Sequence, residues 1–249
     1  MKSTNFSRWA FIIFFSFGVA ACEAPDPLTQ AIEKNTQSRG GAEAIASVQT
    51  LQIRIKITEP SFQVVGEYVA TRDGKMRIDV FADGQRVFTE AFDGDSGWQM
   101  FGDGTVADMS KAGEEAVQHG IITNLYGLNE MAGLGLAIEY SGRKTIAGET
   151  YEKIDLIFED GLVNHYFLQE RTGLIIRQRS DVALHPDVDD TVQRFETVYS
   201  DFRTIGGVVY FFHEEKRDID SGELVQTTQI EEIIQNPEFD PAFFERPEG

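Results

Sequence analysis

The stretch that decides the fold reads LQIRIKIT, from Leu51 to Thr58. Apolar side chains at positions 51, 53, 55 and 57 alternate with polar side chains at 52, 54, 56 and 58. An extended strand points successive side chains to opposite faces of a sheet. This period of two therefore predicts a β-strand with one face in an apolar interior.

The same alternation returns along most of the chain. Asp73-Gly74 and Asp83-Gly84 each separate two alternating runs, which is a strong signal for a β-hairpin. We expect further strands over residues 62–72, 75–81, 86–92, 97–101, 136–140, 151–158, 162–169, 174–182, 192–203, 208–218 and 224–234.

Helical spacing interrupts the strands in two places. A helix is expected from Pro27, behind the capping side chain of Asp26, to the glycine pair at 40–41, and a short one over 42–48. Residues 111–131 carry apolar side chains at helical intervals. We therefore predict a mostly β (α+β) domain with a single large antiparallel sheet of about eleven strands, large enough to curl or close, whose inner face is either capped by the helices or encloses a ligand cavity.

The N-terminal residues have the layout of a secretory signal. Lys2 and Arg8 precede an apolar run at 9–18, and the small residues at 19–21 lead to Cys22, the only cysteine of the 249 residues. The apolar run is shorter than the ~20 residues that span a bilayer. A cysteine directly after such a tripeptide resembles the lipobox of bacterial lipoproteins.

The lipobox resemblance implies a processed and anchored protein. Residues 1–21 would be a lipoprotein signal peptide and residues 22–27 an acylated tether, with diacylglycerol and an N-acyl group on Cys22 as the only covalent additions. In such lipoproteins an aspartate after the cysteine favours the inner membrane. Glu23 stands there instead, so we expect a lipid-anchored protein of the outer membrane that faces the periplasm.

Composition excludes some classes of function. The chain has 22 lysines and arginines against 41 acidic residues. Loss of residues 1–21 removes Lys2 and Arg8, which leaves a net charge of about −21. A surface of this sign repels phosphate groups, so nucleic acid is not an expected partner. No second cysteine remains for a disulfide with Cys22, so stability must come from a packed core.

The body of the chain carries a series of glycine and aromatic motifs: Gly40-Gly41, Asp93-Gly94, Gly97-Trp98, Gly148, Tyr151, Tyr166-Phe167, Thr172-Gly173-Leu174, Tyr199, Phe202, Gly206-Gly207-Val208, Asn236-Pro237 and Phe243-Phe244. Over about residues 28–247 these motifs are similar to those of the Lol-type lipoprotein-carrier superfamily. The resemblance implies an unclosed antiparallel half-barrel domain over 28–249, capped by helices over its mouth, with acyl chains held on its concave face.

Catalytic and metal-binding patterns are not found. Ser96 lacks the glycine spacing of a nucleophile elbow. The four histidines, at positions 119, 165, 185 and 213, lie far apart, without the spacing of metal ligands. The acidic cluster at 185–190 is interpreted as a solvated loop. We expect neither an enzyme, nor a metal site, nor a dissociable cofactor.

Aromatic and aliphatic side chains on the expected strands are the candidate binding residues. Those expected to line a concave cavity are Ile53, Ile55, Tyr68, Trp98, Tyr140, Phe158 and Tyr210. Two functions stay open. One is a membrane-anchored, non-catalytic protein that holds the acyl chains of a lipid or lipoprotein in this cavity. The other is an envelope interaction module, whose core is filled by its own side chains and whose partner is another envelope protein.

Overall fold

The structure is a computed structural model, and it describes residues 26–247. Cys22, Glu23 and the expected signal peptide lie outside the described residues, so the lipobox stays a prediction. Within residues 26–247, no helix combines the length and the apolar character needed to cross a bilayer.

Thirteen strands of the described chain form one antiparallel sheet, in the order β6-β5-β4-β3-β2-β1-β15-β14-β11-β10-β9-β8-β7. The N-terminal half of the sheet consists of β1 (Thr50–Glu59), β2 (Phe62–Thr71), β3 (Met76–Ala82), β4 (Gln85–Phe92), β5 (Gly97–Phe101) and β6 (Val106–Asp108). The C-terminal half consists of β7 (Ala137–Ile146), β8 (Glu149–Ile157), β9 (Val163–Gln169), β10 (Ile175–Val182), β11 (Gln193–Ser200), β14 (His213–Asp218) and β15 (Leu224–Gln235).

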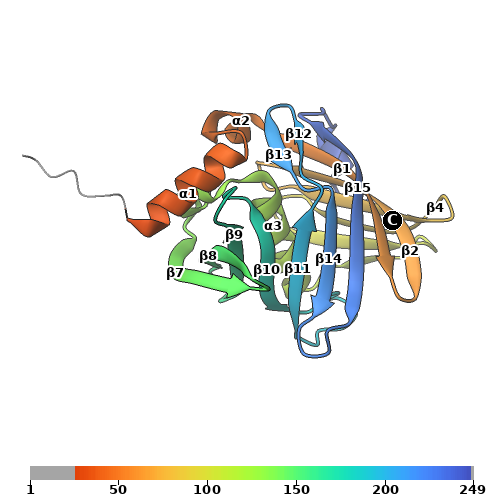
Figure 1. The fold of residues 1–249 in the computed structure, drawn as a ribbon. Coiled ribbons are helices and arrows are strands. Elements are labelled where there is room, and N and C mark those ends of the chain that lie inside the picture. Colours follow the sequence, from red (N-terminus) through yellow and green to blue (C-terminus); the bar gives the residue numbers. More distant parts are fainter. Residues whose placement is uncertain (1–25, 248–249) are drawn as a thin grey trace, which may run out of the picture.

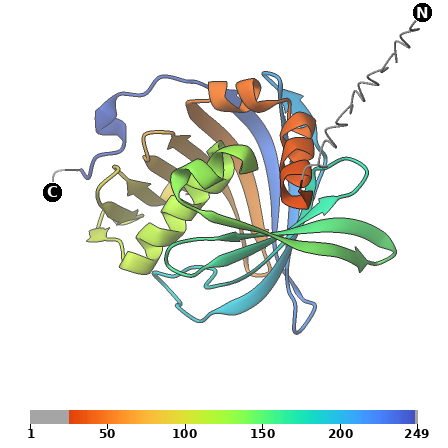
Figure 2. The same ribbon diagram turned by 90° about the vertical axis from the view of Figure 1, so that its left-hand side faces the viewer.

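The two halves of the sheet meet where β1 pairs with β15, from Leu51 opposite Gln235 to Thr58 opposite Thr227 (Figure 1). The outer strands β6 and β7 are not paired with each other, so the barrel is unclosed. The chain between them forms α3 (Lys111–Leu125), α4 (Leu128–Met131) and the short η1 (Ala132–Leu134). Figure 2 shows α3 crossing the concave side of the sheet. The predicted fold class is therefore confirmed.

The strand predictions fail in detail between 192 and 218. One strand was expected over 192–203 and another over 208–218, but β11 ends at Ser200 and β14 begins at His213. Asp201 has a φ of 53°, and this left-handed residue turns the chain out of the sheet. The residues in between form a separate ribbon of β12 (Arg203–Ile205) and β13 (Val208–Tyr210).

The ribbon contacts the junction of the two N-terminal helices, α1 (Pro27–Ser38) and α2 (Ala42–Ser47). The backbone N–H of Val209 donates to the carbonyl of Arg39 at 2.9 Å. A Cβ on Gly40 would lie 1.9 Å from the carbonyl oxygen of Gly207, and Gly40 has a φ of 113°. Glycine at position 40 therefore permits both the helix end and this close approach.

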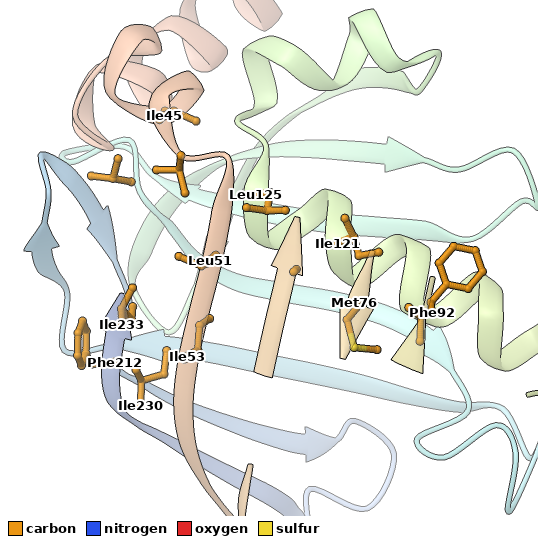
Figure 3. Close-up of a cluster of buried hydrophobic side chains, with 14 of the residues drawn as sticks. Ile45, Leu51, Ile53, Met76, Phe92, Ile121, Leu125, Phe212, Ile230 and Ile233 are labelled. Atoms are coloured by element: carbon orange, nitrogen blue, oxygen red, sulfur yellow. The ribbon is translucent and has the colours of Figure 1, made fainter. Parts of the chain in front are cut away.

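Two clusters of buried apolar side chains lie on the concave side. The first joins α2, α3 and strands β1 to β4 with β15. Figure 3 shows Ile121 and Leu125 on α3 above Met76 and Phe92. The second packs α1 and α4 against β8 and β9, and its members include the fully buried Ile154. The helices therefore cover the sheet with their own side chains over much of its concave face.

Arg72, at the turn after β2, ties the helices to the sheet. Its Nη2 donates to the carbonyls of Ile45 and Leu125, both at 3.0 Å, and its Nε donates to the carbonyl of Val48 at 2.7 Å. Its Nη1 lies 2.8 Å from Oε1 of Glu130. One guanidinium thus satisfies carbonyls at the ends of α2 and α3 together with a carboxylate on α4.

Residues 183–192, between β10 and β11, reach across the concave side to the other half of the sheet. The Asp187 carboxylate accepts from Gln99 Nε2 at 2.8 Å and from the backbone N–H of Ser110 at 2.7 Å. The expected solvated loop is therefore docked at Asp187.

The same Gln99 side chain contacts a partly buried carboxylate, since it also donates to Glu90 at 3.1 Å. Burial raises the pKa of Glu90, and the nearby charge of Asp187 adds to the rise.

The first prediction concerns Arg72. Arg72→Ala leaves three backbone carbonyls and the Glu130 carboxylate without their partner, which should cost about 3–5 kcal/mol of unfolding free energy. Arg54→Ala is the control, since Arg54 also pairs with two glutamates but has 43% of its side chain exposed, against 13% for Arg72. It should cost less than about 1 kcal/mol. Urea unfolding of residues 23–249 measures both; equal losses would contradict this role of Arg72.

The second prediction concerns Glu90. The pKa of Glu90 in the folded protein lies above its ordinary value of 4.5. The stability that protonation of Glu90 contributes is therefore complete below pH 4.5, and it is lost as the pH rises through the raised pKa. Glu90→Gln should therefore raise the melting temperature at pH 7, by about 2–4 °C for each kcal/mol regained. The gain should vanish near pH 4.

The control for this measurement is Glu223→Gln, a change in an exposed turn. It should leave the melting temperature unchanged at both pH values. A Glu90→Gln protein that is less stable than the wild type at pH 7 would show that the charged form of Glu90 is the stabilising one.

Candidate functional site

A cavity of about 420 Å³ lies between α1, α3 and the concave face of β1, β15, β14, β11, β10 and β9. This volume is within the range of about 300–1,000 Å³ that is usual for small-molecule sites. The two apolar clusters do not fill this space, although members of both, such as Ile53 and Tyr166, line it.

One wall of the cavity is apolar and comes from the pair of strands that joins the two halves of the sheet. Leu51 and Ile53 on β1 lie beside Ile230 and Ile233 on β15 (Figure 3). The period of two places Leu51 and Ile53 on the concave face. On β15 the register shifts between the partners of Arg54 and Ile55, and this bulge at Glu231 brings Ile230 and Ile233, three residues apart, onto the same face. All four are buried, and Leu51 has 1% of its surface exposed. This wall suits a hydrocarbon chain.

The opposite wall is polar and hydrogen-bonded across three strands. The hydroxyl of Tyr199 donates to Gln178 Oε1 at 2.8 Å, and Gln178 Nε2 donates to Asn164 Oδ1 at 3.0 Å. Asn164 Nδ2 lies 3.5 Å from the hydroxyl of Tyr166. Burial raises the pKa of Tyr166 to about 12 and that of Tyr199 well above its ordinary value. Both phenols are therefore neutral at physiological pH and can donate a hydrogen bond.

The third side of the cavity is a stripe on α3. Ala116, Gly120 and Thr123 recur at intervals of four and three residues, so they share one face of the helix, and all three line the cavity. A Cβ built on Gly120 meets no heavy atom within 4 Å. The space opposite Gly120 is therefore open.

His119 lies beside this stripe and also lines the cavity. Burial lowers its pKa, while Asp160, with 3.4 Å between His119 Nε2 and Asp160 Oδ2, opposes the change. The ring centroids of His119 and Phe158 are 4.0 Å apart. The imidazole is therefore held as a neutral side chain between an aromatic ring and a carboxylate.

Two of the residues expected to line the cavity do so: Ile53 and Tyr210. Ile55 and Tyr68 face the same interior but pack against the first apolar cluster. The Tyr68 hydroxyl accepts from Asn124 Nδ2 at 3.2 Å. Phe158 belongs to the second cluster.

Trp98 requires a correction, because its side chain lies on the opposite face of the sheet. It pairs with Ala91, whose neighbour Phe92 belongs to the concave core. Alternation therefore points Trp98 to the outer face, where its Nε1 donates to the carbonyl of Phe244 at 2.9 Å, next to η2 (Pro241–Phe243). The buried aromatic character of Trp98 was predicted, but the face was wrong.

Tyr140 also lies outside the cavity. It is on the edge strand β7, and its hydroxyl is hydrogen-bonded to the Glu152 carboxylate on β8. A separate hollow beside it, also of about 420 Å³, is lined by charged groups such as Lys34 and Arg143. An aromatic side chain on an edge strand has fewer neighbours that can bury it. The place of β7 at the edge of the sheet therefore explains why Tyr140 lies outside the cavity.

Sequence reasoning missed the polar residues of the cavity. Gln178 and Tyr199 alternate with the outward-facing residues of their strands, and nothing in the sequence says that their face is the inner one. Asn35 and Arg39, near the end of α1, also line the cavity. Only the glycine pair that follows Arg39 marked this helix end as a place of close packing.

Within residues 26–247, no group of three or more acidic, histidine or cysteine side chains is arranged to hold a metal ion. The polar side chains of the cavity are bonded mainly to one another and to the backbone. The arrangement offers a surface for an amphiphilic ligand.

No protein-family profile and no curated protein matches the sequence. Solved structures, however, are similar in fold. One is a DUF1329 family protein from Desulfovibrio piger, at 12% identity over 89% of this chain and 98% of that chain, with a TM-score of 0.57. A LolA superfamily protein from Nitrosomonas europaea gives 11% identity, 87% and 97% coverage, and a TM-score of 0.58.

A third similar structure is a putative outer membrane lipoprotein-sorting protein domain from Vibrio parahaemolyticus, at 6% identity. It covers 86% of this chain and 94% of that chain, with a TM-score of 0.56. Identities this low indicate a common fold and carry no residue roles. The chain therefore has the LolA-like half-barrel fold that its sequence motifs resemble.

Proposed function

We propose that the protein is a non-catalytic lipid- or lipoprotein-binding protein of the bacterial envelope, which takes acyl chains into the cavity between α3 and the sheet. The observation that carries this proposal is the open cavity of about 420 Å³ against the apolar wall of β1 and β15. A core filled entirely by its own side chains would have left no such space.

The energetics favour an apolar chain in this place. Each methylene group that leaves water for an apolar environment contributes about 0.8 kcal/mol. The side chains of Leu51, Ile53, Ile230 and Ile233 supply that environment. Binding is reversible in this proposal, since the polar wall offers hydrogen bonds rather than a covalent or metal attachment.

The structural likenesses support the same class of function. One similar structure is described as a LolA superfamily protein and another as a putative outer membrane lipoprotein-sorting domain. Both share this fold over most of their length. A role in handling lipid-modified proteins in the envelope agrees with the lipobox-like sequence around Cys22.

The second candidate is an envelope interaction module. The second apolar cluster favours it, because α1 and α4 fill that part of the concave face with the protein's own side chains. In that case the cavity would hold only water, and a protein partner would dock outside it. A ligand-binding measurement distinguishes the two candidates.

The third prediction tests the cavity. Gly120→Trp places an indole in the open space beside α3 and should weaken binding of a fluorescent fatty-acid probe by at least tenfold. Gln118→Trp is the control, since it adds the same side chain to an exposed position of the same helix. It should bind the probe like the wild type.

Residues 23–249 suffice for these titrations, and circular dichroism checks that each variant is folded. Mass spectrometry of co-purified lipids complements them. A folded wild-type protein that binds no probe and carries no lipid would favour the interaction module. Undiminished binding to Gly120→Trp would place the lipid outside the cavity.

The fourth prediction concerns the anchor, which we propose is formed by acyl chains on Cys22 and directs the body to the outer membrane, facing the periplasm. A single myristoyl-sized chain anchors only marginally, whereas several chains anchor firmly. Cys22→Ser should therefore abolish fatty-acid labelling and release the protein from membranes or block its processing. Metabolic labelling and membrane fractionation measure these effects. Label that persists on Cys22→Ser would place the lipid elsewhere.

A further inference from the structure

Arg39 brings a positive charge to the cavity, and no ion pair joins it to a carboxylate in the described part of the chain. The Glu214 carboxylate also lines the cavity, but it accepts from the Thr228 hydroxyl at 2.9 Å. Arg39 follows the last residue of α1, is partly buried, and lines the cavity. Its guanidinium makes one long hydrogen bond, from Nη1 to the carbonyl of Tyr126 at 3.3 Å. An arginine offers five N–H donors, so most of its capacity is unused.

This situation distinguishes Arg39 from the other arginines in the described part of the chain. Eleven of them have a carboxylate within 4.0 Å. The twelfth, Arg171, is exposed to solvent. Only Arg39 combines partial burial with the lack of a carboxylate partner, and a charge removed from water without a partner is unfavourable.

The acidic side chain whose charge acts on Arg39, Glu130, cannot supply the missing partner. Glu130 attracts Arg39 electrostatically, yet both of its oxygens already accept hydrogen bonds, from the Arg72 guanidinium and from the backbone N–H of Gly127. Burial lowers the pKa of Arg39 from its ordinary value, but an arginine remains protonated in proteins. The positive charge at this end of the cavity is therefore permanent.

A second unmet polar group lies on the same helix. Asn35, one turn before Arg39, is fully buried and lines the cavity. Its Nδ2 donates to the carbonyl of Gly173 at 2.8 Å, while its Oδ1 has no hydrogen-bond partner. Tyr166 and Tyr210 complete the polar lining near Arg39, since both interact with its charge. Buried polar groups are normally satisfied, so this end of the cavity has the character of a binding site. The Asn35 oxygen is an acceptor and calls for a donor, so the attraction for an anion comes from Arg39 alone.

We propose that the ligand is an amphiphile with a single anionic head group that pairs with Arg39, while its hydrocarbon chain lies along the apolar wall of β1 and β15. This inference rests on the proposed lipid-binding function and names the chemical class of the ligand. A carboxylate or a phosphate accepts two parallel hydrogen bonds from a guanidinium. The shared chemistry is a negatively charged oxygen pair on an alkyl chain.

The test uses the full mature protein in lipid nanodiscs, with partition into empty nanodiscs subtracted. Three competitors with the same C16 chain displace a fluorescent lipid: palmitate, hexadecyl phosphate and hexadecanol. The wild type should bind at least one anion ten times more tightly than the alcohol, and the stronger anion identifies carboxylate or phosphate as the head group. Arg39→Gln should lose this preference, so that its affinity for each anion falls to about its affinity for hexadecanol.

Two control variants make the assignment specific. Arg171→Gln removes an unpaired but exposed arginine and should change nothing. Lys216→Gln removes the other cation that lines the cavity, on β14, and should keep the preference for the anion. A preference lost in Lys216→Gln but kept in Arg39→Gln would overturn the assignment to Arg39.

The remaining outcomes separate this inference from the proposed function. A wild type that binds the two anions and the alcohol equally well overturns the inference and leaves lipid binding intact. A wild type that binds none of the three overturns both. Arg39→Lys keeps the charge but not the fork of donors, so it should retain part of the preference.

Discussion

The contacts of the Arg72 guanidinium are the interaction on which the rest of the structure depends. A curled sheet with one apolar face needs a cover, and the cover here consists of helices whose ends expose unpaired carbonyls. Arg72 satisfies three of these carbonyls and also stacks over the Tyr126 ring at 4.3 Å. The Tyr126 hydroxyl in turn donates to the carbonyl of Arg72. The turn after β2 and the end of α3 are therefore fixed to each other from both sides.

Arg72 fixes the covering helices at one end of the sheet. The position of the cavity then depends on how the side chains of α3 pack on the concave face. Next to Arg72 the helices pack closely and exclude ligand, as Ile121 and Leu125 show. Val117, one turn before Ile121, also reaches the first apolar cluster, so α3 packs on the sheet over most of its length. Ala116 and Gly120 lie on another face of the helix, where their small size leaves room for the cavity. The cavity is thus the consequence of a helix that carries large side chains on one face and small ones on the neighbouring face.

The alternation from Leu51 to Thr58 and the Asp-Gly turns were enough to predict the antiparallel sheet, whereas its unclosed form and the helices over its mouth were predicted from the resemblance to the Lol-type superfamily. The alternation and the turns were not enough to predict which face of the sheet a given aromatic residue occupies. One residue more or fewer in a turn moves every side chain of the following strand to the other face. Trp98 shows this directly. The role of Arg72 could not be predicted either: locally it reads as part of an Arg-Asp-Gly turn, and its partners lie on elements far away in sequence.

The pairing of β1 with β15 has a consequence for the order of events when the protein is made. The backbone N–H of Thr50 donates to the side chain of Asn236, 186 residues later. The two halves of the sheet therefore cannot be joined until β15, the last strand, has been synthesised. Contacts between such distant segments form slowly, because a long loop must close first. Pairing of β1 with β15 is thus a late step in the folding of this chain.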